Sequence, residues 1–154
     1  MSRRAQIAMS DEEVLAFLTE RRIITCASLG PDGWPHLVPL WYALRGSTVW
    51  AWTYTASQKV RNLERDPRAS IQAESGESYE QLRGVLLRTT VTLHRDQEQV
   101  AALGTEIFER YYGMLTAETH AMVGKQAAKR VGLEFVPAGP AASWDHGKLG
   151  AGVY

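Results

Sequence analysis

Three consecutive strands are expected in residues 23–53, whose sequence is IITCASLGPDGWPHLVPLWYALRGSTVWAWT. The segment opens with a run, residues 23–29, that is rich in Ile, Thr and Ala. GPDG at residues 30–33 is then a strong turn signal ahead of a second apolar run, residues 35–44. The Arg-Gly-Ser that follows turns the chain again, into a strand at residues 48–53. Loops this short connect antiparallel neighbours, whereas a parallel pair needs a crossover of about a dozen residues or more. The segment therefore predicts an antiparallel sheet and disfavours a doubly wound parallel one.

The rest of the chain predicts helices outside this sheet and further strands. Ser10 with Glu13 three residues later has the form of a capping box, which begins a helix. Pro67 ends a short helix, because the residue before a proline is pushed out of the helical region. The expected helices are residues 10–21, 57–65, 96–112 and 116–129, and the remaining strands are residues 69–74, 81–94 and 131–136. Residues 137–154 are too rich in Gly, Ala and Pro for a regular element.

These elements predict a mainly β (α+β) fold: a small six-stranded antiparallel β-barrel with helices packed outside it. A length of 154 residues with 45% hydrophobic content is that of one ordinary domain with a real core. We therefore expect an N-terminal arm, residues 1–9, followed by a single domain, residues 10–154.

The charge and cysteine content indicate a soluble intracellular protein. Seventeen Lys and Arg balance seventeen Asp and Glu, so no overall field attracts nucleic acid or an anionic membrane. Cys26 is the only cysteine, which excludes an intramolecular disulfide and fits a reducing cytoplasm. The N-terminus lacks the apolar stretch of a signal peptide, and no stretch approaches the roughly 18 apolar residues of a membrane span. We expect a cytoplasmic protein that binds neither nucleic acid nor a membrane.

Several common site patterns are absent from the sequence. It has no Walker phosphate loop and no GxGxxG between a strand and a helix. The four histidines form no HExxH pair and have no cysteine partners, so no metal site is expected. Ser143, Asp145 and His146 are the residue types of a hydrolytic triad without a GxSxG elbow, and a polar loop explains them better. The five tryptophans are typical of core or hairpin packing, although Trp41 and Trp52 on adjacent strands could wall one pocket.

One basic segment remains, at the corner between the third strand and the helix after it. Ser57 falls where an N-cap is expected, so the free backbone NH groups of Gln58, Lys59 and Val60 would point outward beside the lysine. Such a helix N-terminus is a ready phosphate site, and a charge-assisted hydrogen bond there is worth roughly 1.5–3 kcal/mol. The alternative is a solvated helix face, since Lys and Arg usually lie in water. The basic residues are accordingly divided between the anion site (Lys59, with Arg61 as a second candidate) and solvent (Arg65 and Arg68).

The same segment resembles a known family. WTYTASQK at residues 52–59, with the NL and DPRA that follow it, resembles the flavin-phosphate-binding segment of the pyridoxamine 5'-phosphate oxidase-like split-barrel superfamily. KVRNLERDPRAS at residues 59–70 looks like the actinobacterial branch that binds the deazaflavin coenzyme F420. The similarity extends over residues 10–154 and includes PDGWPHLVPLWY, LRGV at residues 82–85 and the terminal SWDHGKL.

The resemblance implies a six-stranded split barrel that forms a homodimer, with one cofactor in each of two clefts between the subunits. In the family, a Ser and a Lys at the positions of Ser57 and Lys59 hold the phosphate. Thr53 lies beneath it, the strand matching residues 38–41 lines the ring, and C-terminal residues reach across from the partner. The cofactor-binding residues expected on this basis are Val38, Pro39, Leu40, Trp41, Trp52, Thr53, Ser57, Gln58, Lys59, Val60, Asn62, Tyr79 and Trp144.

The resemblance further implies a reductase that transfers hydride between F420 and an unidentified small organic substrate. The alternatives are an FMN-binding oxidoreductase using the same cleft, and a carrier that binds the cofactor without turnover. Vitamin B6 oxidation is disfavoured, because the oxidase proper has an Arg immediately before its Lys, where this chain has Gln58, and its C-terminal basic clamp is not recognisable here. No catalytic residue is identified, although Tyr42, Tyr54 and Tyr79 are candidate proton donors.

Overall fold

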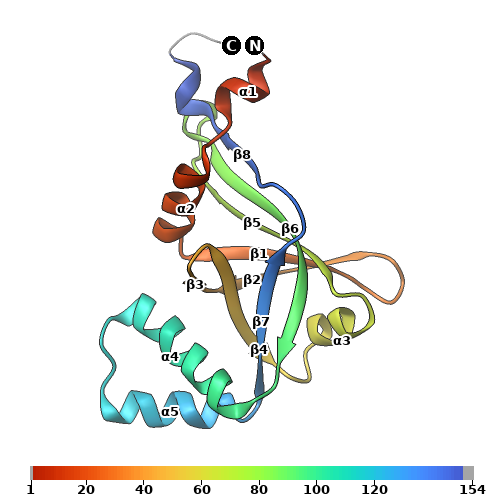
Figure 1. Cartoon of the computed structure of the whole chain (residues 1–154), viewed down its shortest axis with the longest axis vertical. Coiled ribbons are helices and arrows are strands. Elements are labelled where there is room, and N and C mark those ends of the chain that lie inside the picture. Colours follow the sequence, from red (N-terminus) through yellow and green to blue (C-terminus); the bar gives the residue numbers. More distant parts are fainter. Residues whose placement is uncertain (1, 151–154) are drawn as a thin grey trace.

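The computed structural model describes residues 2–150, which form one curved antiparallel sheet with helices around it (Figure 1). The strands are β1 (Ile23–Leu29), β2 (Pro35–Trp41), β3 (Ala43–Arg45), β4 (Thr48–Tyr54), β5 (Arg68–Ser75), β6 (Arg83–His94), β7 (Arg130–Pro137) and β8 (Ala142–Asp145). The helices are α1 (Arg3–Ile7), α2 (Asp11–Glu20), α3 (Gln58–Arg65), α4 (Gln97–Tyr112) and α5 (Ala117–Ala127), with short 3-10 turns η1 (Tyr79–Gln81) and η2 (His146–Leu149). The predicted mainly β split-barrel fold with peripheral helices is confirmed.

The sheet closes on itself at Tyr42. The strand order is β2-β1-β5-β6-β7-β4-β3, with β8 paired to β6. The strands at the two ends of this order, β2 and β3, follow each other in the chain with only this residue between them. The chain therefore passes from one edge of the sheet to the other, and β2 approaches β4 without pairing to it, which leaves the barrel split. The predicted strand over residues 35–44 is two strands for this reason. Together with β8, this gives eight strands in the described part of the chain, where six were expected.

Hydrogen bonds at the end of α2 hold this bend in place. Tyr42 is fully buried, and its hydroxyl donates to the carbonyl oxygens of Leu18 and Arg21. The Arg110 guanidinium lies 4.4 Å above the tyrosine ring and donates to the same two carbonyls at 2.8 and 2.7 Å. Burial raises the pKa of the Tyr42 hydroxyl to about 12. The hydroxyl is engaged within the fold, as a cap for carbonyls that have no partner inside the helix.

Alternation along the strands directs one side of the sheet into the barrel core. On β1, Ile24, Cys26 and Ser28 are buried while their neighbours are partly exposed, as expected for the two-residue period of a strand. The interior facing them is completed by residues such as Leu133 and Phe135 of β7. Burial raises the pKa of the Cys26 thiol to about 11, so the predicted free cysteine is an inert core residue.

A second core lies on the other side of β4, beneath α4. Trp52 is buried there with Leu103 and Ile107, and its ring packs so closely on Gly104 that an added Cβ would lie 2.3 Å from it. The capping box predicted at Ser10 is present at the start of α2. None of the helices in residues 2–150 combines the length and apolar character that a membrane-spanning helix requires.

The C-terminal segment is more regular than predicted. Its β8 pairs with β6, which places Trp144 opposite Gly84, where an added Cβ would lie 2.1 Å from the indole ring. Lys148 of η2 then donates to the Ala8 carbonyl and pairs with Glu13 of α2, at 2.9 and 2.7 Å. Within the expected N-terminal arm, α1 is helical and packs against η2, so the first and last described helical segments lie side by side (Figure 1). The last four residues of the predicted irregular tail lie outside the described residues.

Candidate functional site

The candidate anion site lies at the corner where β4 ends and α3 begins. A turn closed by a hydrogen bond from the Ser57 NH to the Tyr54 carbonyl (3.0 Å) joins the two elements. The Thr55 NH also donates to the Lys129 carbonyl (2.9 Å), which ties the turn to the start of β7. Helix α3 then packs against β1 (Figure 1). The predicted helix after the third strand is therefore confirmed, and its N-terminus is positioned by three strands.

Lys59 points back from α3 to the end of β4. Its ammonium donates to the Thr53 hydroxyl at 2.8 Å, and Thr53 itself is buried. The ion pairs of residues 2–150 do not include this lysine. Burial lowers the pKa of the half-buried ammonium, and the nearby Arg130 guanidinium lowers it further. Lys59 is thus a partly desolvated cation whose partner in this chain is a neutral hydroxyl, which leaves it available to an anion.

The first turn of α3 leaves donors without partners. Ser57 is the N-cap, as predicted, but its side chain makes no capping hydrogen bond, and its buried Oγ has no partner in the described part of the chain. The NH groups of Gln58, Lys59 and Val60 lie in the turn where a helix supplies no carbonyls. A buried polar atom without a hydrogen bond costs roughly 1–3 kcal/mol. An acceptor bound at this helix end would remove that cost.

The side chains of Gln58 and Asn62 bond to each other and to β1, and so hold α3 in its orientation. The Gln58 amide donates to Asn62 Oδ1 at 2.8 Å, and Asn62 Nδ2 donates to the Ser28 hydroxyl of β1 at 3.1 Å. Asn62 is fully buried, as is the Val60 side chain beside it. These residues hold the helix end against the barrel, so the structure assigns their side chains a positioning role.

Arg130, the first residue of β7, lies beside the same corner and was not predicted. Its guanidinium lies between the rings of Trp52 and Tyr54, with its central carbon 4.6 and 4.2 Å from their centroids. Its Nε is buried and has no hydrogen-bond partner among the residues that the structure describes, and burial lowers the pKa of the guanidinium. The register that places it opposite Tyr54 arises from the pairing of β4 with β7, which are separated by about half of the chain. No local sequence pattern connects the two.

The residues expected to line a cofactor ring are divided between two faces of β2. Val38 and Leu40 point inward and are half-buried against the barrel core, whereas Pro39 and Trp41 are exposed on the outer face. Trp41 stacks on Tyr111 of α4 with centroids 4.2 Å apart. Val38 and Leu40 therefore belong to the barrel interior, and Pro39 and Trp41 belong to the outer face of β2.

Trp41 and Trp52 do not face each other across a cavity in this chain. Their rings both contact Phe108 of α4, at centroid distances of 6.3 and 6.2 Å. Helix α4 thus occupies the space between them. Each is better described as packing with this helix than as a wall of one shared pocket.

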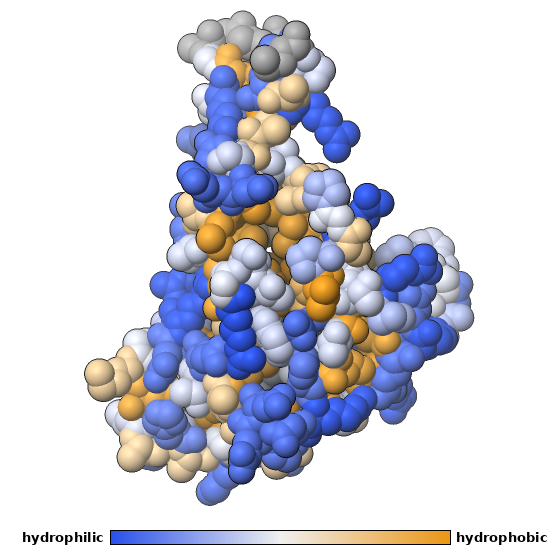
Figure 2. Space-filling view, in the orientation of Figure 1, coloured by the Kyte–Doolittle hydropathy of each residue, from blue (hydrophilic) through white to orange (hydrophobic). Residues whose placement is uncertain are grey.

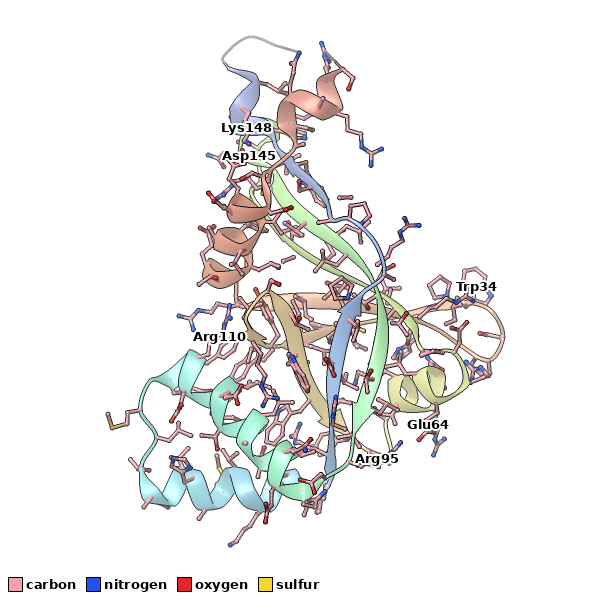
Figure 3. The ribbon with its side chains drawn as sticks, viewed as in Figure 1. Trp34, Glu64, Arg95, Arg110, Asp145 and Lys148 are labelled. Carbon is pink, nitrogen blue, oxygen red and sulfur yellow. The ribbon has the colours of Figure 1, made fainter. Side chains whose placement is uncertain are left out.

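Tyr79 and Trp144 lie at the opposite end of the molecule from α3. Tyr79 packs on His146 with ring centroids 4.4 Å apart. In Figure 3, Asp145, the neighbour of Trp144, lies near the top of the view, and Glu64 of α3 lies at the lower right. Within one chain, the segments that carry Tyr79 and Trp144 are therefore distant from the α3 corner (Figure 1).

A separate groove of about 570 Å³ lies where β1, β5 and β6 meet, and its lining includes Ala27, Ser70, Arg88 and Thr90. It does not include the corner at Lys59. Figure 2 shows hydrophobic side chains exposed over the middle of the molecule, at the level of β1. Among residues 2–150, no three His, Cys, Asp or Glu side chains are grouped to hold a metal ion.

Comparison with known proteins gives a family and several structural relatives. The sequence pattern of a family described as pyridoxamine 5'-phosphate oxidase matches residues 10–139. A conserved hypothetical protein from Mycobacterium tuberculosis is 40% identical, with a TM-score of 0.90 over 100% of this chain and 96% of that one. No curated protein sequence matches the chain.

Two more distant structures share the fold. One, described as an F420 reductase, is 23% identical, with a TM-score of 0.64 over 86% of this chain and 97% of that one. The other, a heme storage protein from Vibrio cholerae, is 18% identical, with a TM-score of 0.67 over 84% and 91% of the two chains. Their descriptions differ while the fold is shared, so the ligand has to be inferred from the site itself.

Proposed function

This chain belongs to the pyridoxamine 5'-phosphate oxidase family, and we propose from this premise that it is an oxidoreductase that binds the deazaflavin coenzyme F420 at the α3 corner. The donor set there fits the phosphate group of such a cofactor. The observation that carries the proposal is the combination of Lys59, which has no acidic partner among residues 2–150, with the Ser57 hydroxyl at a helix N-terminus, which has no hydrogen-bond partner there either. Anions bind at helix N-termini because free NH groups and the helix dipole both favour negative charge there.

Each residue of the corner has a distinct task in this proposal. Lys59 and Ser57 hold the phosphate, and Thr53 keeps the lysine side chain extended toward it when no ligand is bound. In this proposal residues 38–41 of β2 lie against a bound ring and exclude water from one side of it. The deazaflavin supplies the hydride chemistry, while the protein supplies binding and orientation of a small organic substrate against it.

F420 is preferred over FMN in the proposal for two reasons. The segment KVRNLERDPRAS resembles the branch that uses the deazaflavin, and one structural relative is described as an F420 reductase. FMN in the same cleft is the second candidate, since the phosphate donors would serve either cofactor. A carrier without turnover is the third, because no catalytic residue is identified at the corner, where Tyr54 is a candidate proton donor.

We further propose that the functional unit is a homodimer. The outer face of β1 and β2 exposes apolar side chains that a monomer would leave in water: Ile23, Leu37 and Trp41 are 51%, 60% and 38% exposed. A second copy on this face would bury them and could bring Tyr79 and Trp144 to the partner's cofactor. Light scattering after gel filtration should give twice the chain mass, and Leu37→Asp should give the monomer. A monomeric wild-type protein would exclude a site shared between subunits.

Titration of the purified protein with F420, FMN and hemin, each followed by its own absorbance or fluorescence, tests the cofactor. Saturable binding of F420 at one per chain is expected, with FMN weaker. Tighter binding of FMN would select the second candidate, and binding of hemin alone would remove both flavin-type cofactors. Oxidation of reduced F420 by a panel of organic acceptors then separates an enzyme from a carrier, which would bind stoichiometrically and show no turnover.

A further inference from the structure

The groove where β1, β5 and β6 meet takes no part in the proposed function. Its volume is about 570 Å³, which is within the range of roughly 300–1,000 Å³ found for small-molecule sites. Neither Ser57 nor Lys59 is among the residues that line it. The groove is therefore separate from the α3 corner.

The register of the three strands gives the groove its shape. Ala27 of β1 is paired with Ser70 of β5, and Ser70 is paired with Arg88 of β6. In each strand a residue next to the paired one is buried in the core, so these three side chains point outward on one face of the sheet. Two small side chains thus form a low floor, and the long side chain of Arg88 stands at one end of it.

Arg88 contributes a positive charge that nothing in the groove balances. The ion pairs of residues 2–150 do not include Arg88. The other cation of the groove, Arg68, is paired with Asp66 at 2.6 Å. No Asp or Glu is among the lining residues. The groove therefore has an excess of one positive charge, and that charge belongs to Arg88.

The rest of the lining is apolar or carries hydroxyl groups. Leu29 and Pro35 lie at the β1–β2 end of the groove, and Ala138 lies on the side of β6. The Ala138 NH donates to the Arg88 carbonyl at 2.8 Å, which holds the segment after β7 beside the arginine. The Thr90 hydroxyl belongs to the same lining. An apolar wall with a few polar groups beside one charge is typical of a site for a small organic molecule.

We infer that this groove is a second ligand site, for a small organic molecule that carries one carboxylate on an apolar body. The planar guanidinium of Arg88 can donate two parallel hydrogen bonds to a carboxylate. A monoanion balances the single unpaired charge, and the apolar lining accommodates the rest of the ligand. The inference does not rest on the proposed cofactor site, since it uses no residue of the α3 corner.

NMR titrations of the apoprotein with naphthoate and naphthamide test the inference. The two compounds share one ring system and differ in charge. Saturable binding of naphthoate is expected, with naphthamide at least about tenfold weaker. Arg88→Gln should weaken naphthoate binding roughly tenfold to a hundredfold, the range of one charge-assisted hydrogen bond, and should change naphthamide binding less than about threefold.

Three further variants locate the bound molecule. Ser70→Ile raises the floor of the groove without a change of charge and should weaken both ligands. Arg4→Gln removes the same net charge as Arg88→Gln from an exposed position on α1, and it should leave both affinities near wild type. Lys59→Met should also leave naphthoate binding unchanged, because the α3 corner lies outside the groove.

Three results would overturn the inference: no saturable binding of naphthoate, equal affinities for naphthoate and naphthamide, or a naphthoate affinity that falls in Lys59→Met and not in Arg88→Gln. Naphthyl phosphate carries close to two charges at neutral pH, and binding of it more than about tenfold tighter than naphthoate would assign the groove to phosphate esters instead. F420 titrations of wild type and Arg88→Gln should agree. Failure of the cofactor proposal and failure of this inference are therefore distinguishable.

Discussion

Lys59→Met is expected to weaken cofactor binding while leaving the apoprotein at least as stable. Methionine keeps most of the length of the side chain and removes its charge. The lost interaction is one charge-assisted hydrogen bond to phosphate, and the ammonium is only half-buried, so we take the lower end of the roughly 1.5–3 kcal/mol range. Since about 1.4 kcal/mol corresponds to a factor of ten, affinity for F420 or FMN should fall roughly tenfold.

The free energy of unfolding of the apoprotein should rise or stay unchanged in Lys59→Met. The folded protein lowers the pKa of Lys59 by burial and by the neighbouring Arg130. Between that lowered pKa and the ordinary value near 10.5, the unfolded chain binds more protons than the folded one. The free energy of unfolding of the wild type should therefore rise with pH in this window, and the cost of the buried charge should be fully present below it. Lys59→Met has no such cost and should lack this rise.

Urea unfolding of the apoproteins at pH 7 and pH 10, with cofactor titrations at pH 7, measures both effects. Lys129→Met is the matched control, because Lys129 is exposed and should alter neither quantity. An unchanged cofactor affinity in Lys59→Met would place the phosphate elsewhere. Destabilisation of the apoprotein by more than about 1 kcal/mol would show that Lys59 is a packing residue rather than one kept for a ligand.

Other substitutions test the packing that supports the site. Gly104→Ala should destabilise the protein by about 1–3 kcal/mol in urea unfolding, because its Cβ would lie 2.3 Å from the Trp52 ring. At Gly124 an added Cβ would meet no neighbouring side chain within 4 Å, so Gly124→Ala should be neutral or stabilising by up to about 1 kcal/mol. Equal changes in the free energy of unfolding for the two variants would contradict the close packing of Gly104 on Trp52. Tyr42→Phe should cost about 1–3 kcal/mol by removing the donor to the end of α2, and a thermal shift below one degree would contradict that role. Cys26, with a pKa of about 11 and 1% exposure, should not react with a thiol reagent at pH 8 until the protein unfolds, so rapid labelling of the native protein would show an open barrel.

The parts of the fold predicted correctly from the sequence were those with local causes. A short turn between apolar runs can only join antiparallel neighbours. The capping box is a pattern of four consecutive residues, Ser10 to Glu13, that by itself indicates where a helix begins. The same holds for Ser57 as an N-cap. The interaction of Lys59 with Thr53 is also local, since both residues flank one turn.

The features that were missed depend on contacts between distant parts of the chain. The bend at Tyr42 exists because the two sheet edges meet there, and its hydrogen bonds are to carbonyls of a helix some twenty residues earlier. Strand β8 has a composition that suggests a loop, and it is ordered by pairing with β6, where Gly84 leaves room for Trp144. Arg130 reaches the corner only through the register of β4 with β7.

The position of the cofactor phosphate in a crystal structure with F420 or FMN bound decides whether the α3 corner is the cofactor site. We predict a phosphate oxygen within about 2.7–3.2 Å of both Lys59 Nζ and Ser57 Oγ, with the bond from Lys59 to Thr53 lengthened or replaced. A phosphate found in the groove beside Arg88, with Lys59 still bonded to Thr53, would contradict the proposal.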